Sequence, residues 1–118
     1  MTQPVDPRHY LPLSPQQFHI LLALEGNDRH GYGIILDVAR RTDGALRMGT
    51  GTLYTAMARL VALELVADSG REDERRRYYR LTPLGRRVLV AETARLEALV
   101  RDAHRQGVRG PAPARTRS

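Results

Sequence analysis

Residues 49–84 read GTGTLYTAMARLVALELVADSGREDERRRYYRLTPL, and this stretch decides the fold. Its first part places apolar residues at the three- and four-residue spacing of a helix, which predicts a helix from residue 49 or 50 to about 63. The buried stripe of this helix is expected to consist of Leu53, Met57 and Leu60. The second part predicts two strands, over residues 65–69 and 76–81, which flank a charged loop and form a hairpin.

Helices are predicted on both sides of this stretch. Ser14 and the proline after it start a helix that runs to about residue 25, because serine caps a helix and proline suits its first position. Residues 33–41 are expected to form a second helix, which a short glycine-containing turn separates from the third. After the hairpin, Thr82 is expected to cap a long helix over about residues 83–105.

Three helices, a hairpin and a long last helix follow the order of a winged helix-turn-helix. The predicted fold class is mainly α with a two-stranded β wing, a winged helix-turn-helix followed by a long C-terminal dimerisation helix. We expect four parts in the chain: a flexible N-terminal arm (1–13), the winged DNA-binding domain (14–82), the dimerisation helix (83–105) and a disordered basic tail (106–118).

Composition indicates the kind of partner. The 118-residue chain has a formal net charge of +6, and all 19 of its basic residues are arginines. A basic domain attracts polyanions, of which nucleic acid is the commonest, so double-stranded DNA is the predicted partner. No apolar run approaches the ~20 residues that cross a bilayer, and the polar N-terminus with its prolines is unlike a signal peptide. We therefore expect a cytoplasmic protein with no membrane partner.

Catalytic and metal sites are not expected. The chain has no cysteine, which excludes a disulfide framework and thiolate zinc sites. Its 4 histidines are scattered without carboxylates at ligand spacing, and the absence of lysine excludes a phosphate-binding loop that depends on one. We predict no enzyme activity, no cofactor and no metal, and we expect His30 to pack or cap beside Tyr32.

The outward side of the helix predicted at 49–63 carries small residues and one arginine. Exposed helix faces usually hold glutamate, lysine and glutamine, whereas small residues permit close approach to the major groove, which is about 12 Å wide. Threonine can bond to base edges, and arginine can reach guanine or a phosphate. The candidate DNA-binding residues on this helix are Thr50, Gly51, Thr52, Thr55 and Arg59.

Two further groups are candidates, each with an alternative. Tyr32 and Tyr54 lie beside the apolar stripes, where a tyrosine either donates its hydroxyl to a phosphate or packs half-buried. The wing carries arginines that suit a DNA backbone or a narrow minor groove. Three acidic residues, 72–74, either leave these arginines to DNA or pair with them in a solvated turn. The wing arginines proposed to contact DNA are Arg75, Arg76 and Arg77.

The predicted last helix indicates a dimer. A 23-residue helix is about 34 Å long, more than a small winged domain needs to cover its core. Its apolar side includes a seven-residue repeat, as in a helix–helix seam. Glu92 lies inside this stripe, where it either sets the register of a partner helix or lies exposed at the edge. The predicted seam residues are Leu89, Glu92, Leu96, Leu99, Val100 and Ala103.

Three stretches resemble the signatures of PadR-type transcriptional regulators: HGYGI at 30–34, GTLYTAMARL at 51–60 and RRYYRLTPLGRRVL at 76–89. They keep the order and spacing usual in that family, and the resemblance covers roughly residues 17–100. It implies a homodimer that binds a palindromic operator, with DNA contacts from Tyr32 and the GTLY segment. Some members respond to phenolic acids or planar drugs, which makes a small planar or phenolic effector a candidate partner.

Two positions depart from the family pattern. Thr50 stands where the family often has proline, and we expect it to cap the third helix. Glu64 stands where a glycine usually follows that helix, so the helix lacks its usual C-cap residue.

The predicted function is that of a sequence-specific duplex-DNA-binding transcriptional regulator, with repression as the family's usual mode. The alternative is a winged helix that acts as a protein–protein interaction adaptor without specific DNA binding. Salt separates the two, because binding through phosphate contacts weakens steeply as ionic strength rises.

Overall fold

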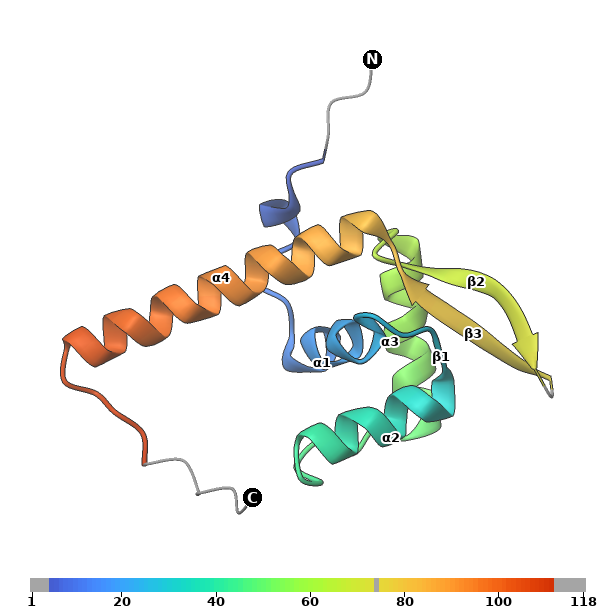
Figure 1. Cartoon of the computed structure of the whole chain (residues 1–118), viewed down its shortest axis with the longest axis horizontal. Helices are drawn as coiled ribbons and strands as arrows, with labels where there is room; N and C mark the ends of the chain where they lie inside the picture. The colour runs from blue at the N-terminus through green and yellow to red at the C-terminus, as the bar shows by residue number, and fades with distance from the viewer. Residues whose placement is uncertain (1–4, 74, 112–118) are drawn as a thin grey trace.

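The computed structural model describes residues 5–73 and 75–111 (Figure 1). Three helices lie on one side of the long last helix, the β2–β3 hairpin projects to one side, and the last helix extends far to the other. The predicted mainly α fold with a β wing is confirmed. Its elements in chain order are η1 (a 3-10 helix, Pro7–Tyr10), α1 (Pro15–Leu24), β1 (Arg29–His30), α2 (Gly31–Arg41), α3 (Thr50–Ala62), β2 (Val66–Asp73), β3 (Arg76–Leu81) and α4 (Pro83–Arg105).

The sheet has a third strand that the sequence pattern does not predict. Its order is β1-β3-β2, all antiparallel, and β1 pairs His30 with Tyr78. A two-residue strand is too short to show alternation, so no local signal marks it. Strand β2 also continues to Asp73, beyond the predicted 65–69, with a register irregularity between Asp68 and Glu72. The hairpin is therefore longer than expected.

The predicted helix caps agree with the structure at two places and differ at a third. Ser14 and Gln17 form a reciprocal capping box at α1, as a serine cap predicts. Helix α4 begins after Thr82, whose Oγ1 accepts the N–H of Gly85 at 2.9 Å. The expectation that Thr50 caps α3 is wrong, because the cap position is Gly49 and makes no side-chain hydrogen bond.

The core fixes the orientation of α3. Leu53, Met57 and Leu60 are at most 2% exposed, as the helical spacing predicts. They belong to one core cluster with buried residues of α1, α2, β2, α4 and the link before β2, namely Ile20, Leu21, Ile34, Val38, Leu65, Val66 and Val88. Because one side of α3 is fully buried, the opposite side is held toward solvent.

Helix α3 ends in the conformation that a glycine usually adopts, although the residue there is glutamate. Glu64 has a φ of 63°, in the left-handed region. Its N–H donates to the carbonyl of Val61 at 2.9 Å, and the N–H of Leu65 donates to the carbonyl of Leu60 at 3.0 Å. These two bonds make a complete Schellman motif. The departure from the family pattern at Glu64 therefore leaves the helix end intact.

The junction between α3, β2 and α4 is tightly packed. Thr82 donates its hydroxyl to the carbonyl of Glu64 at 2.7 Å. Gly85, in the first turn of α4, lies so close to the residue before β2 that an added Cβ would be 2.0 Å from the carbonyl oxygen of Leu65. Only glycine fits there, so the start of α4 is held against Glu64 and Leu65, which lie between α3 and β2.

The prediction that the N-terminal arm is flexible is partly wrong. Within residues 5–13, η1 packs against α4, and Leu13 is buried. The Leu13 N–H donates to Oε2 of Glu92 at 2.8 Å. The arm folds back because its apolar residues Tyr10, Leu11 and Leu13 join the core cluster. The prediction for residues 1–4 lies outside the described part of the chain.

The predicted disordered tail is described only in part. Residues 106–111 follow the end of α4 as an exposed segment without a helix or strand. The remainder of the predicted tail, residues 112–118, lies outside the described residues.

Candidate nucleic-acid interface

The outward side of α3 forms one wall of a shallow surface groove. Gly51, Thr52, Thr55 and Arg59 are all exposed, and they line a cavity of about 560 Å³ together with Ala56 and residues at the start of α1. Thr50, at the first position of α3, is exposed too. The structure thus brings four of the five helix candidates together on one surface.

Residues of α1 were not predicted to belong to this surface. Ser14, Gln16 and Gln17 face the α3 candidates across the groove. Ser14 and Gln17 hydrogen-bond to each other in the capping box. Gln16 carries an amide that can read base edges or bind phosphates. Its proximity to α3 depends on how the two helices pack, which no local pattern encodes.

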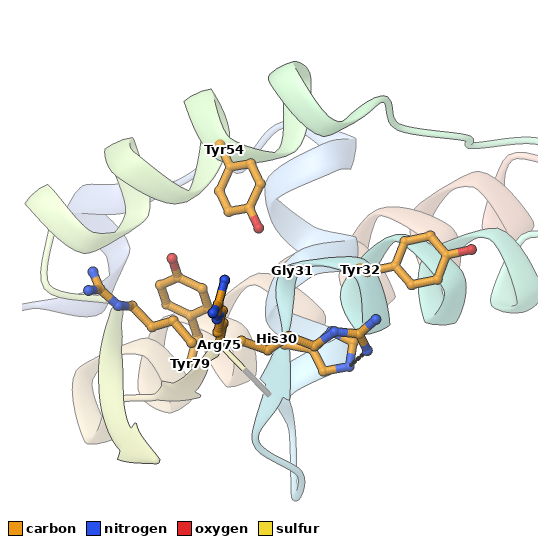
Figure 2. A pocket seen from close by; sticks show the side chains of 8 residues that line it. His30, Gly31, Tyr32, Tyr54, Arg75 and Tyr79 are labelled. Atoms are coloured by element: carbon orange, nitrogen blue, oxygen red, sulfur yellow. Dashed lines mark hydrogen bonds between the residues drawn. The ribbon is translucent and has the colours of Figure 1, made fainter. Parts of the chain in front are cut away.

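A second cavity, of about 400 Å³, lies between the wing and the starts of α2 and α3. Figure 2 shows the hydroxyls of Tyr54 and Tyr79 directed toward the space between α3 and the wing, whereas Tyr32 points away from them. The cavity gathers all five of the predicted tyrosine and wing-arginine candidates, with three residues that were not predicted. Its lining residues are His30, Gly31, Tyr32, Tyr54, Arg75, Arg76, Arg77 and Tyr79.

Gly31 sets the distance between α2 and α3 at this cavity. A Cβ at Gly31 would lie 2.6 Å from the hydroxyl oxygen of Tyr54 and 3.2 Å from Cδ2 of Leu53. The absence of a side chain therefore lets the Tyr54 hydroxyl rest against the first turn of α2. Tyr54 remains 47% exposed, so its hydroxyl is placed by packing but still open to a ligand.

His30 is held by contacts on each side of its ring. Its Nδ1 accepts the N–H of Gly33 at 3.0 Å and caps α2, which confirms the expected capping role. The His30 ring packs edge to face against the Tyr78 ring, with 5.3 Å between the ring centroids. The Arg71 guanidinium lies over the Tyr78 ring, 4.1 Å from its centroid. The Nε2 atom lies 3.0 Å from Nη1 of Arg76.

Two titratable groups of this cavity are held in their neutral forms. Burial, followed by the charges of Arg76 and Arg71, lowers the pKa of His30, and the charge of Asp73 opposes this only weakly. Burial, followed by the neighbouring Tyr54, raises the pKa of Tyr79. At neutral pH the imidazole is therefore uncharged, and the Tyr79 phenol keeps its proton.

The wing arginines differ in their described partners. Arg77 pairs with Asp68 at 3.2 Å, but both side chains are largely exposed, so the pair contributes little stability. The ion pairs of the described side chains include none for Arg75 or Arg76. The alternative in which acidic residues neutralise the wing stays a prediction for Glu72 and Glu74, whose side chains lie outside the described residues.

The predicted seam on α4 is divided by the core. Leu99 and Val100 are 53% and 52% exposed, and Leu96 and Ala103 are half-buried. Leu96 and Val100 line an apolar groove of about 450 Å³ that also includes Phe18 of α1. Four of the six predicted seam residues therefore lie on the part of α4 that leaves the domain.

Leu89 and Glu92 do not fit the seam prediction. Leu89 is 5% exposed and Glu92 1% exposed, because the N-terminal arm covers this part of α4. The Glu92 carboxylate accepts hydrogen bonds from Arg95 and from the N–H of Leu13. The hydrogen bond from Arg95 lowers the pKa of Glu92. Burial acts in the opposite direction, and the hydrogen bond from the Leu13 N–H lowers the pKa further. Glu92 thus anchors the arm within one chain, and neither expectation for it, register setting or exposure, is correct.

Within residues 5–73 and 75–111, no cluster of three or more histidine and acidic side chains is arranged to hold a metal ion. Over the same residues, no helix combines the length and apolar character that a membrane crossing requires.

Comparison with known proteins gives consistent matches. The model of the transcriptional regulator PadR-like family matches residues 20–91. A transcriptional regulator of Mycobacterium tuberculosis is 34% identical over 88 residues, which are 73% of this chain and 79% of that protein.

Solved structures match over most of the chain as well. A transcriptional regulator from Clostridium thermocellum superposes with a TM-score of 0.67 at 29% identity, covering 86% of this chain and 93% of that one. A PadR family transcription regulator from Clostridium difficile has the same fold, with a TM-score of 0.67 at 22% identity over 80% of this chain and all of that one.

Proposed function

This chain belongs to the PadR-like family of transcriptional regulators, and from that premise we propose that it is a sequence-specific repressor that binds an inverted-repeat operator as a homodimer. Duplex DNA is bound by the outward side of α3 in the major groove and by the wing along the backbone. The proposed contacts are Tyr32, Thr50, Gly51, Thr52, Tyr54, Thr55, Arg59, Arg75, Arg76 and Arg77.

One observation carries the DNA-binding proposal. The burial of Leu53, Met57 and Leu60 leaves the small residues of α3 and Arg59 uncovered by the chain itself. The small residues at the start of this face can approach base edges closely, because they carry no long side chain. The neighbouring cavity adds arginines and tyrosine hydroxyls, which are groups that bind phosphates.

The dimer is proposed on the distal part of α4. An apolar groove and two half-exposed apolar side chains, Leu99 and Val100, lie beyond the region that the core covers. A second copy of the same surface, related by a two-fold axis, buries them. The seam of this proposal consists of Leu96, Leu99, Val100 and Ala103, without Leu89 and Glu92.

Release by a small planar or phenolic effector is the remaining part of the proposal. The groove at Phe18, Leu96 and Val100 adjoins the proposed seam, and its 450 Å³ lies within the usual size of small-molecule sites. An effector there competes with or reshapes the seam and thereby changes the spacing of the two winged domains.

Selection of bound duplexes from a random pool tests the proposal directly. We expect enrichment of inverted repeats whose half-sites are about one helical turn apart, ~34 Å or 10–10.5 base pairs. Affinity for an enriched duplex should fall by roughly 10³–10⁵ between 50 and 200 mM salt if ~6–10 phosphates are neutralised. An unenriched pool and a flat salt titration would instead support a protein–protein interaction adaptor.

A further inference from the structure

The two nitrogens of the His30 ring make contacts that one neutral imidazole cannot satisfy together. Nδ1 accepts a hydrogen bond from the N–H of Gly33, so it carries no proton. The ring proton of the neutral form must then lie on Nε2. That atom is 3.0 Å from Nη1 of Arg76, and a guanidinium only donates. In the tautomer that caps α2, two donors therefore face each other.

The other assignments leave the same conflict. Moving the proton to Nδ1 lets Nε2 accept from Arg76 but sets the ring N–H against the N–H of Gly33. Protonating both nitrogens loses the cap and adds a second cation beside Arg76, and burial together with the nearby arginines already disfavours that form. The hydrogen bonds and ion pairs of the described side chains include no acceptor shared by both donors, so a lone pair from outside the chain would satisfy them.

We infer that the His30 Nε2–H and the Arg76 guanidinium together bind one phosphate of the DNA backbone, with neutral His30 as the donor of a hydrogen bond. The inference rests on the proposed function and adds to it a DNA-binding residue that the sequence assigned to packing or capping alone. A phosphodiester oxygen accepts from both groups at once and removes the conflict between them.

The surroundings of the pair favour an anion. The side chains that line the cavity are those of arginines, tyrosines and His30, and no described carboxylate is among them. Tyr54 extends the cavity directly to the α3 surface, so a backbone phosphate beside the major groove can reach it. The ring of His30 cannot turn freely, because its cap to Gly33 and its edge contact with Tyr78 fix its plane.

A pair of substitutions separates the donor role from the capping role. Serine is as good an N-cap as any residue, so His30→Ser keeps the start of α2 but removes the donor that reaches Arg76. Each protein is titrated with a random-sequence duplex at several salt concentrations, because a phosphate contact is independent of sequence. Thermal unfolding of each variant is measured in parallel, and His9→Ser, at an exposed position of η1, is the matched control.

We expect His30→Ser to weaken duplex binding about tenfold with an unchanged salt slope, because a neutral donor releases no counterion. Arg76→Ala should weaken binding and lower the slope by about 1. The double variant should lose less than the product of the two single losses, since both groups bind one phosphate. His9→Ser should bind like the unmodified protein.

Equal binding by His30→Ser and the unmodified protein would overturn the inference while leaving DNA binding itself intact. A slope reduced by about 1 in His30→Ser would also overturn it, because the ring would then act as a cation. An unmodified protein that binds no duplex at low salt would overturn the proposed function and, with it, this inference.

A measurement on the unmodified protein covers the case in which His30→Ser unfolds. Nitrogen NMR of ring-labelled histidine should show His30 as the Nε2–H tautomer, with the Nε2–H resonance moving on addition of the random-sequence duplex. A Nδ1–H tautomer, or a resonance unmoved by duplex, would contradict the inference. Inorganic phosphate at matched ionic strength should move the resonance less than duplex does, and an equal movement would indicate a site for free anions instead.

Discussion

At the scale of single residues, the sequence predicts the positions that follow from the regular spacing of apolar residues along a helix. The outward position of Thr55 and Arg59 follows from the buried stripe on the same helix, so the sequence alone predicts it. The cavity positions of His30 and Tyr79 do not follow from any local pattern, because they depend on the pairing of β1 with β3 across nearly fifty residues. The burial of Glu92 does not follow from a local pattern either, since Leu13, which donates to its carboxylate, belongs to a distant segment.

Gly51 offers a substitution with opposite effects on folding and binding. It lies in the first turn of α3 with no atom within 4 Å of an added Cβ. Gly51→Ala should raise the free energy of unfolding by up to about 0.5 kcal/mol, because alanine loses less backbone entropy in a helix. The added methyl should weaken duplex binding if this surface touches DNA, as measured by fluorescence anisotropy. Gly110→Ala, also in open space, is the control and should leave binding unchanged.

Glu64 offers a test of the strained helix end. Glu64→Gly should raise the free energy of unfolding by about 0.5–1 kcal/mol, because glycine adopts a positive φ without the penalty that a Cβ brings. Urea unfolding measures the difference. Glu64→Ala keeps the strain and should bring no such gain, and equal stability of the two variants would show that the left-handed conformation is not strained.

At the scale of elements, the helices and hairpin were predictable because their signals are local. Capping residues, apolar spacing and alternation locate α1, α3, β3 and α4 to within a few residues. The elements that the sequence does not predict are η1 and β1, which have four and two residues and gain their structure by packing on other elements. Short elements of this kind are defined by tertiary contacts, which a single sequence does not display.

Asp37 connects β1 to α2 and gives a pH-dependent prediction. It is 3% exposed and lies between Arg29, Arg40 and Arg41. Burial opposes its ionisation, but hydrogen bonds from Arg41 and Arg40 and the charge of Arg29 outweigh it and hold the pKa of Asp37 below the ordinary 3.8. A lowered pKa stabilises the folded state above the ordinary value, and this contribution disappears as pH falls through the lower folded value.

Asp37→Asn should therefore lower the free energy of unfolding by about 1–3 kcal/mol at pH 7. The difference from the unmodified protein should shrink below about pH 4. Denaturant unfolding at pH 7, 4 and 3 measures it. Asp102→Asn, in an exposed pair with Arg105, should change stability little at any of these values. A constant difference across the series would mean that ionisation of Asp37 contributes nothing.

At the scale of the whole molecule, the sequence predicts the winged part and the long helix better than it predicts the boundary between them. The sequence pattern divides the winged part from the long helix at residue 82, but in the structure the core extends along α4 as far as Glu92. The N-terminal arm accounts for this, because it covers the first half of α4. On the second half of α4, Leu99 and Val100 remain exposed.

Val100→Arg tests the proposed dimer. Placing a charge in the seam should convert a dimer to a monomer, since an unpaired charge would be buried there. Sedimentation equilibrium should show half the mass, and affinity for an inverted-repeat duplex should fall toward that for a single half-site. Val108→Arg, which adds the same charge at an exposed position past α4, should remain dimeric. A dimeric Val100→Arg protein would place the interface elsewhere.

The junction at Thr82 and Gly85 has a mechanical consequence. One hydroxyl bridges Glu64, just past the end of α3, and the first turn of α4, and Gly85 lies close against Leu65. Helix α4 is therefore connected rigidly to the winged part, with no hinge at its first turn. A small rotation of the far end of α4 therefore turns α3 and the wing through the same angle. A partner bound to that end would set the orientation of α3.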